Sequence, residues 1–244
     1  MQSVTTLIRK EVASFFNSLI GYMVIAVFLT GVGLFFWLFE GNILETGIAG
    51  LDALFDFGPY MFLLLVPAIT MRAFSEEIKT GTIEFLVTKP ITDWQIILGK
   101  FLASVLLVIF ALLPTFIYYI TVYYLSSPVG NLDNGAIITS YIGLFALGAI
   151  FSAIGIFTSA LSDNQIVAFI AGVFLCFFLF LAFDFTANIQ ALSAVNGIFI
   201  KIGIMEHYRS ISRGVIDTRD IVYFISVIVI FLVMTKIVLN GKRQ

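Results

Sequence analysis

Six separate apolar runs, each close to the length needed to cross a lipid bilayer, dominate this chain of 244 residues. A membrane-spanning helix needs about 20 apolar residues to cross roughly 30 Å of hydrocarbon. Charged residues make up only 11% of the chain, whereas a soluble domain keeps about a quarter of its residues charged. We therefore predict an all-α membrane protein, with residues 1–244 forming one transmembrane domain. The predicted spans lie near residues 19–39, 57–74, 96–125, 137–161, 165–183 and 221–239.

The basic residues between these runs predict how the chain is oriented. Short cytoplasmic segments of membrane proteins carry an excess of Lys and Arg. Basic residues precede the first run, follow the last and lie between the second and third, whereas the loops at 40–56 and 126–136 contain none. We therefore expect both termini and the loop between the second and third runs to be cytoplasmic. The residues concerned are Arg9, Lys10, Arg72, Lys79, Lys89, Lys100, Lys242 and Arg243.

The segment between the fifth and sixth runs, residues 184–220, does not fit a plain extracytoplasmic loop. Within this segment, residues 189–205 are apolar and contain one charged residue, Lys201. A seventh span there would move the basic C-terminus outside, against the charge rule. We therefore predict a re-entrant helical segment that enters the membrane from outside, with Asn196 and Gly197 at its turn and Lys201 near the outer interface.

The first 18 residues have the pattern of an amphipathic helix. Apolar side chains recur on one helical face, while Arg9, Lys10 and Glu11 lie off that face. This pattern is typical of a helix that lies in the membrane interface, and we predict such a helix over residues 1–18. The alternative is a cytoplasmic extension of the first span. The apolar face comprises Val4, Leu7, Ile8, Val12 and Phe15.

Motifs for catalysis or cofactor binding are absent from the sequence. The glycine-rich phosphate-binding motif does not occur, and one histidine, His207, and one cysteine, Cys176, cannot build a His- or Cys-based metal centre. The apolar runs also contain almost no ionisable residues, which disfavours an ion-coupled carrier. We therefore expect no catalytic residues, no cofactor, no metal and no nucleic-acid partner, and we interpret Cys176 as a small buried apolar residue.

The cytoplasmic segment at 73–92 combines acidic and apolar residues in a way that favours docking onto another protein. Gly81 interrupts residues 75–88, which predicts two short helical pieces. A solvated loop, the plainer alternative, has no need for Phe85 and Leu86. After Pro90, Thr92 and Gln95 have the spacing of a capping box, so the third span should begin near residue 93 and should kink at Pro114.

The same segment carries a pattern that resembles the signature of ABC-2 type permeases: Arg72-x-x-x-x-Glu77-x-x-x-Gly81-Thr82-x-Glu84-x-Leu86-x-x-x-Pro90, then Gly99-Lys100. The resemblance implies six spans with both termini inside, a re-entrant pair before the last span and a coupling helix between spans two and three. It also implies an ABC ATPase as partner, because that helix fits a groove on the ATPase in this family. The expected coupling residues are Glu76, Glu77, Gly81, Thr82, Glu84, Phe85 and Leu86.

Three further stretches resemble the gliding-motility-associated ABC permeases of Bacteroidetes. They are MRAFSEE at 71–77, SDNQIVAF at 162–169 and HYRSISRGVIDTRD at 207–220. This resemblance implies a subunit of the bacterial inner membrane that is not itself an enzyme and that serves export, gliding motility or the cell envelope. It also implies a second permease protomer, identical or related. The alternative function is a membrane-embedded scaffold or enzyme of envelope assembly that acts without an ATPase.

Two further groups of residues have a functional and a structural interpretation. Small residues at positions 148, 152, 155 and 159 fall on one helical face, where they can form a seam between two protomers or pack helices within one protomer. Arg209 and Arg213 precede the sixth run and can contact lipid headgroups or merely anchor the chain at the interface. The stripe comprises Gly148, Ser152, Gly155 and Ser159.

Overall fold

The computed structural model describes residues 2–82, 92–187, 202–215 and 217–242, and these residues contain helices and no strands. Six helical segments are long and apolar enough to cross a membrane, which confirms the predicted fold class. In chain order the elements are α1 (Gln2–Phe16), α2 (Leu19–Trp37), α3 (Ile43–Thr46), α4 (Asp52–Thr70), α5 (Ser75–Lys79), α7 (Asp93–Leu112), the 3-10 turn η1 (Leu113–Thr115), α8 (Phe116–Leu125), α9 (Asn134–Leu161), α10 (Gln165–Phe177), the π-helical turn η2 (Phe178–Ala182), α11 (Phe183–Ala187), α13 (Ile204–Ser212) and α14 (Thr218–Gly241).

Local signals in the sequence set several helix boundaries. Gln95 Oε1 accepts a hydrogen bond of 3.0 Å from the Thr92 amide, so α7 begins at Asp93 as the capping box predicts. Pro114 lies in the 3-10 turn between α7 and α8, at the predicted kink. The second span begins at Asp52, five residues before the predicted position of 57, because Pro59 is accommodated inside α4. The π-helical turn in the fifth span was not predicted.

Helix α9 is the centre of the bundle. It packs against α4, α7, α10, α13 and α14, and 83% of its most apolar stretch is buried. For α2 and α14 the corresponding share is only 22%. In a membrane-spanning bundle the remaining apolar surface of these outer helices faces lipid or another protein.

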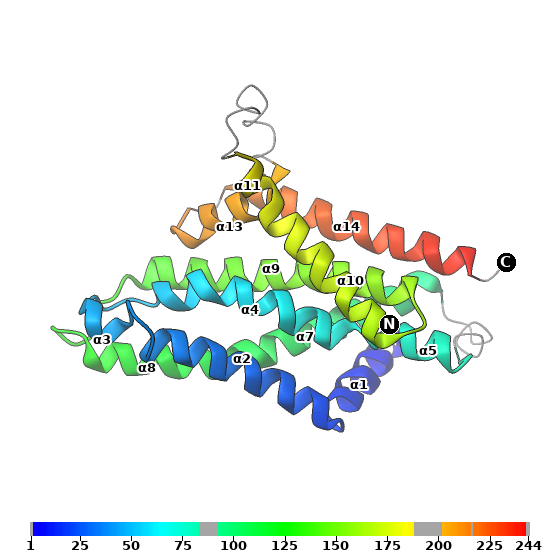
Figure 1. The fold of residues 1–244 in the computed structure, drawn as a ribbon, viewed down its shortest axis with the longest axis horizontal. Coiled ribbons are helices and arrows are strands. Elements are labelled where there is room, and N and C mark those ends of the chain that lie inside the picture. The colour runs from blue at the N-terminus through cyan, green and yellow to red at the C-terminus, as the bar shows by residue number, and fades with distance from the viewer. Residues whose placement is uncertain (1, 83–91, 188–201, 216, 243–244) are drawn as a thin grey trace.

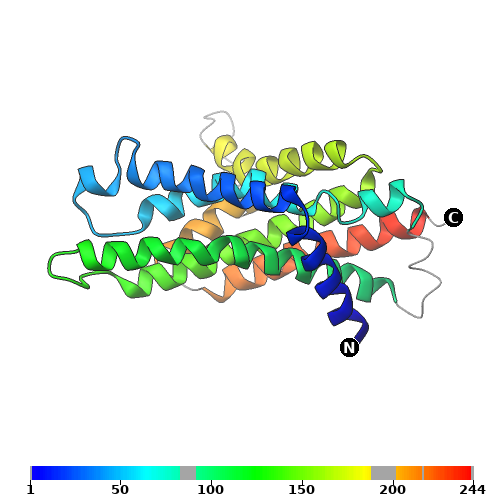
Figure 2. The same ribbon diagram turned by 90° about the horizontal axis from the view of Figure 1, so that it is seen from below.

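The bundle has two distinct ends. Helices α1 and α5 and the C-terminus lie toward one end, while α3 and the connection between α8 and α9 lie at the other (Figures 1 and 2). We call these the α5 end and the α3 end.

Helix α1 is separate from α2 and lies at an angle to the bundle (Figure 2). Ser18 is the N-cap residue of α2, and its Oγ accepts a hydrogen bond of 3.3 Å from the Ile20 amide. Leu7, from the predicted apolar face, is buried against α7, where a Cβ on Gly99 would lie 2.7 Å from Leu7 Cδ2. Residues 2–16 are therefore a helix of their own, and its position in the membrane interface stays a prediction.

The predicted re-entrant turn lies outside the described residues, because Asn196, Gly197 and Lys201 belong to 188–201. The next described helix, α13, lies at the α3 end against α9. Tyr208 donates a hydrogen bond of 2.6 Å to the Phe55 carbonyl, and Ser140 of α9 donates one of 2.9 Å to the Ser212 carbonyl. Helix α13 is thus fixed to the bundle, and the re-entrant segment itself stays a prediction.

Candidate functional site

The beginning of α5 is held by a side chain from another helix. Phe74, which precedes α5, has no side-chain oxygen that could cap it. Instead Ser159 Oγ, from the end of α9, accepts hydrogen bonds from the amides of Phe74 at 2.9 Å and Ser75 at 3.1 Å, and donates one of 2.9 Å to the Met71 carbonyl. Helix ends leave amides without intrahelical partners, so Ser159 fixes the position of α5 relative to α9.

A buried lysine joins α5 to two further helices. The side chain of Lys100, on α7, is only 2% exposed. Its Nζ lies 3.0 Å from Glu11 Oε1 of α1 and 2.9 Å from Glu77 Oε1 of α5, and it donates to the Ala73 carbonyl. The Phe74 ring lies 5.0 Å from the same nitrogen. Because every donor of the ammonium has a partner, the charge can be buried without a large penalty.

The two neighbouring acids of α5 therefore have different surroundings. Glu77 points inward to Lys100 and is 13% exposed, and Lys10 of α1 lies 3.8 Å from it. Glu76 is exposed. Glu77 thus connects α5 to α7 through Lys100, whereas Glu76 faces outward.

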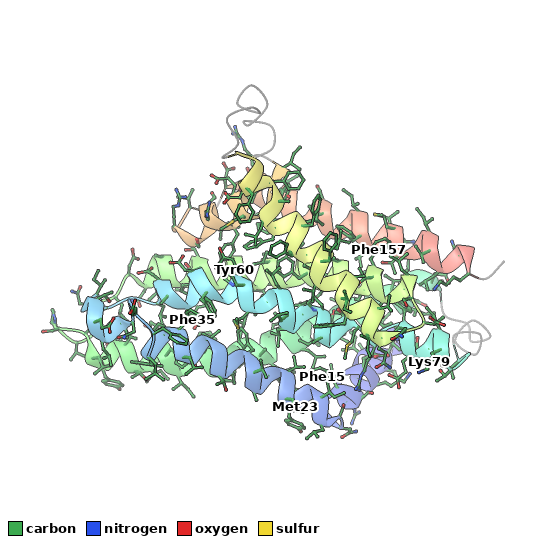
Figure 3. The ribbon with its side chains drawn as sticks, viewed as in Figure 1. Phe15, Met23, Phe35, Tyr60, Lys79 and Phe157 are labelled. Carbon is green, nitrogen blue, oxygen red and sulfur yellow. The ribbon has the colours of Figure 1, made fainter. Side chains whose placement is uncertain are left out.

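After α5 the backbone turns sharply at Gly81. Its φ is 68°, in the left-handed region that residues with a β-branched side chain rarely adopt. Thr80 and Thr82 share a hydrogen bond of 2.9 Å between their hydroxyl oxygens across this turn. The remaining expected coupling residues, Glu84, Phe85 and Leu86, lie outside the described residues. Lys79, the last residue of α5, is labelled in Figure 3.

The small-residue stripe of α9 packs within the chain. A Cβ on Gly148 would lie 2.7 Å from Val108 of α7, and a Cβ on Gly155 would lie 2.0 Å from Thr70 Oγ1 of α4. Ser152 and Ser159 are completely buried. Since α4, α5 and α7 of the same chain cover this face, it is not available as a seam with a second protomer.

The residues expected to contact headgroups lie on α13, at the α3 end. Arg209 Nη1 forms an ion pair of 3.0 Å with Asp184 Oδ1 of α11. His207 Nδ1 lies 2.6 Å from Asp220 Oδ1 of α14. Arg213 is exposed at the end of α13. Arg209 and His207 thus tie α13 to its neighbours, and headgroup contact by Arg213 stays a prediction.

The described residues include the one histidine of the chain, His207, and its one cysteine, Cys176. No group of three His, Cys, Asp or Glu residues in this part of the chain could hold a metal ion. Cys176 is completely buried on α10, in agreement with its interpretation as an apolar residue. Sequence reasoning missed the role of Glu11 as a partner of Lys100 and the role of Ser159 as the cap of α5, and only hydrogen bonds between distant helices identify them.

The comparisons with known proteins agree with this architecture. The family model described as ABC-2 family transporter protein matches residues 5–242. The match includes the six candidate spans of the described residues, most of α1 and the whole of α5. The comparison with curated proteins gave no match.

Proposed function

The chain belongs to the ABC-2 family of transporter proteins and is a multi-pass permease subunit, and we propose that it transmits ATP-driven movement from a partner ATPase through α5. Transport by such a subunit requires a partner that hydrolyses ATP, since the sequence has no phosphate-binding motif of its own. Two permease protomers, identical or related, and two ATPase subunits would complete the transporter.

The observation that carries this proposal is the attachment of α5 to three other helices. Ser159 connects it to α9, and Glu77 connects it through Lys100 to α7 and α1. A short helix that is fixed at several points moves together with the elements that hold it. A displacement imposed on α5 would therefore reach the central helix of the bundle, which is what a coupling element must do.

The contact with the ATPase is proposed for residues 75–88, which comprise α5 and the chain directly after it. The turn at Gly81 directs the chain out of α5, and the exposed Glu76 is available to a basic partner surface. Phe85 and Leu86 are the proposed apolar anchors, because central apolar side chains dominate interface energies. The resemblance to gliding-motility permeases supports a role in export, gliding motility or the envelope, in the bacterial inner membrane.

Changing Phe85 and Leu86 together to Asp should weaken ATPase binding at least about tenfold, because two unpaired charges would enter the interface. The measurement is co-purification of the ATPase from native membranes in mild detergent, normalised to the amount of permease. The matched control is Leu44→Asp with Ile48→Asp, two exposed apolar residues at the α3 end. An unchanged yield of ATPase in the Phe85/Leu86 variant would contradict the proposal.

The proposed orientation places the α5 end in the cytoplasm. Cysteines introduced in place of Ile48 and Val129, exposed at the α3 end, should react with an impermeant thiol reagent in intact cells or spheroplasts. A cysteine in place of Thr80 should react only after lysis. Cys176, the one native cysteine, is completely buried and should give no background. Labelling at position 80 in intact cells would reverse the orientation.

A further inference from the structure

Two adjoining hollows lie beside the junction of α1 and α2. The first is a polar cavity of about 290 Å³ between α1, α2, α4, α5 and α7, at the α5 end. The second is an apolar groove of about 360 Å³ between α2, α4 and α10. Ile20 and Ala68 line both, so the two hollows adjoin each other. Phe15 lines the cavity and Met23 lines the groove, and both residues are labelled in Figure 3.

The polar cavity contains a guanidinium whose charge no acid of the described residues neutralises. Arg72 lines the cavity and takes part in none of the ion pairs found in this part of the chain. Its Nη1 donates a hydrogen bond of 3.1 Å to Ser18 Oγ, and its Nε is buried with no described partner. A guanidinium has five donors in a fork that fits the oxygens of a phosphate. Arg72 thus retains capacity to bind an oxyanion.

The same cavity also offers acceptors for a cation. Glu76 is exposed and lines the cavity, and Glu77 Oε2 has no described hydrogen-bond partner although its Oε1 binds Lys100. Glu11 lies on the opposite wall. With Lys10, Arg72 and Lys100, the cavity lining carries three cations and three carboxylates, so its formal charge is balanced and it has no excess of positive charge for a headgroup with a net negative charge. Such a lining favours a headgroup that carries a phosphate and an ammonium together.

The groove has the properties required for an acyl chain. Its lining residues are all apolar, and it extends along α2 from Ile20 to Phe28, a distance of about 12 Å at 1.5 Å per residue. Met23 and Val27 are more than half exposed although they lie in a membrane-spanning helix. The groove therefore leads from the polar cavity into the region of the hydrocarbon.

We propose that the cavity and the groove together bind one glycerophospholipid with a phosphoethanolamine headgroup. Its phosphate lies at Arg72, its ammonium faces Glu76 and Glu77, and one acyl chain passes Ile20 and Ala68 into the groove. The lipid thus joins α1, α2, α4 and α5 at the end of the bundle where α5 is held. This site shares Glu76 with the proposed ATPase contact, but it is argued from the cavity and the groove and does not depend on that contact.

The test is native mass spectrometry of the delipidated full-length chain with added phosphatidylethanolamine or phosphatidylglycerol. We expect a one-to-one phosphatidylethanolamine adduct and weaker binding of phosphatidylglycerol. Arg72→Gln should lower the affinity about tenfold or more, because a charge-assisted hydrogen bond is lost, and Arg72→Lys should retain part of it. The matched control, Arg219→Gln, removes an exposed arginine at the start of α14 and should bind as the wild type does.

The binding of the acyl chain in the groove is tested separately. Ala68→Phe should block the passage between cavity and groove and abolish lipid binding, while the thermal unfolding midpoint shows that the bundle is intact. Soluble glycerophosphoethanolamine and inorganic phosphate should bind far more weakly than the lipid. Equal binding by wild type and Arg72→Gln, tighter binding of phosphatidylglycerol, or equal binding of free phosphate would each overturn the proposal. A change of oligomeric state in Ala68→Phe without loss of lipid would assign the groove to a second copy of the chain. No ATPase is present, so the result is independent of the coupling proposal.

Discussion

Replacing Lys100 with methionine should destabilise the protein by about 3–5 kcal/mol, because it leaves two partly buried carboxylates without their counterion. Glu11 and Glu77 are 22% and 13% exposed, and Lys100 Nζ is the nearest cation to both, since the exposed Lys10 lies 3.8 Å from Glu77. Methionine fills much of the space of the lysine stem, so the loss arises mainly from the charges. Helices α1 and α5 should then separate from α7. The measurements are the thermal unfolding midpoint in detergent and the rate of proteolysis within the first 82 residues.

The charges can be tested by removing them together. The triple variant Lys100→Met, Glu11→Gln, Glu77→Gln contains no unpaired charge at this position and should recover most of the lost stability. Lys236→Met is the matched control, since Lys236 on α14 lies over the Trp94 ring at 5.0 Å and has no carboxylate partner among the described residues. A single variant as stable as the wild type would show that the cluster contributes nothing.

The helices and their ends were largely predictable from the sequence, because their signals are local. The length of an apolar run limits a span to a known number of residues. Thr92 and Gln95 act within one turn, and Pro114 acts on its own helix. Gly81 takes the positive φ that a glycine between two short segments indicates. The start of α4 was missed, since prolines inside a membrane helix are tolerated more readily than in a soluble one.

The contacts at the candidate site were not predictable, because they join residues that lie far apart in the chain. Lys100 and Glu11 are 89 positions apart, and Ser159 and Phe74 are 85 apart. A spacing of small residues identifies a helical face but does not say which neighbour covers it. The seam between protomers and the packing within one protomer therefore had equal support from the pattern, until α4 and α7 were found against Gly155 and Gly148.

The contacts of α13 were likewise not predictable from the sequence. Its basic residues suggested lipid contact, since charges near a membrane surface often face headgroups. Two residues of this segment instead have partners within the chain, Arg209 with Asp184 and His207 with Asp220. Those partners lie on α11 and α14, and only the folded arrangement of the three helices brings them together.

Replacing Gly155 with alanine should destabilise the bundle by about 3 kcal/mol or more, at the upper end of the range for overpacked interiors. The added Cβ would lie 2.0 Å from Thr70 Oγ1 and 2.9 Å from Thr70 Cβ. Thr70 cannot easily turn away, since it is 1% exposed and its hydroxyl donates a hydrogen bond of 2.9 Å to the Val66 carbonyl. Helices α4 and α9 would have to separate by about 1 Å to reach normal van der Waals distances.

Overpacking at Gly155 can be distinguished from the general effect of replacing a helical glycine with alanine. Gly241→Ala, on α14, has no heavy atom within 4 Å of the new Cβ and should leave stability unchanged or slightly raised, because alanine is the better helix former. In the double variant Gly155→Ala, Thr70→Gly the small residue moves from α9 to α4, so the two helices can again approach closely. Its thermal unfolding midpoint in detergent should lie above that of Gly155→Ala alone. A midpoint for Gly155→Ala equal to the wild type would show that the contact between α4 and α9 is looser than these distances require.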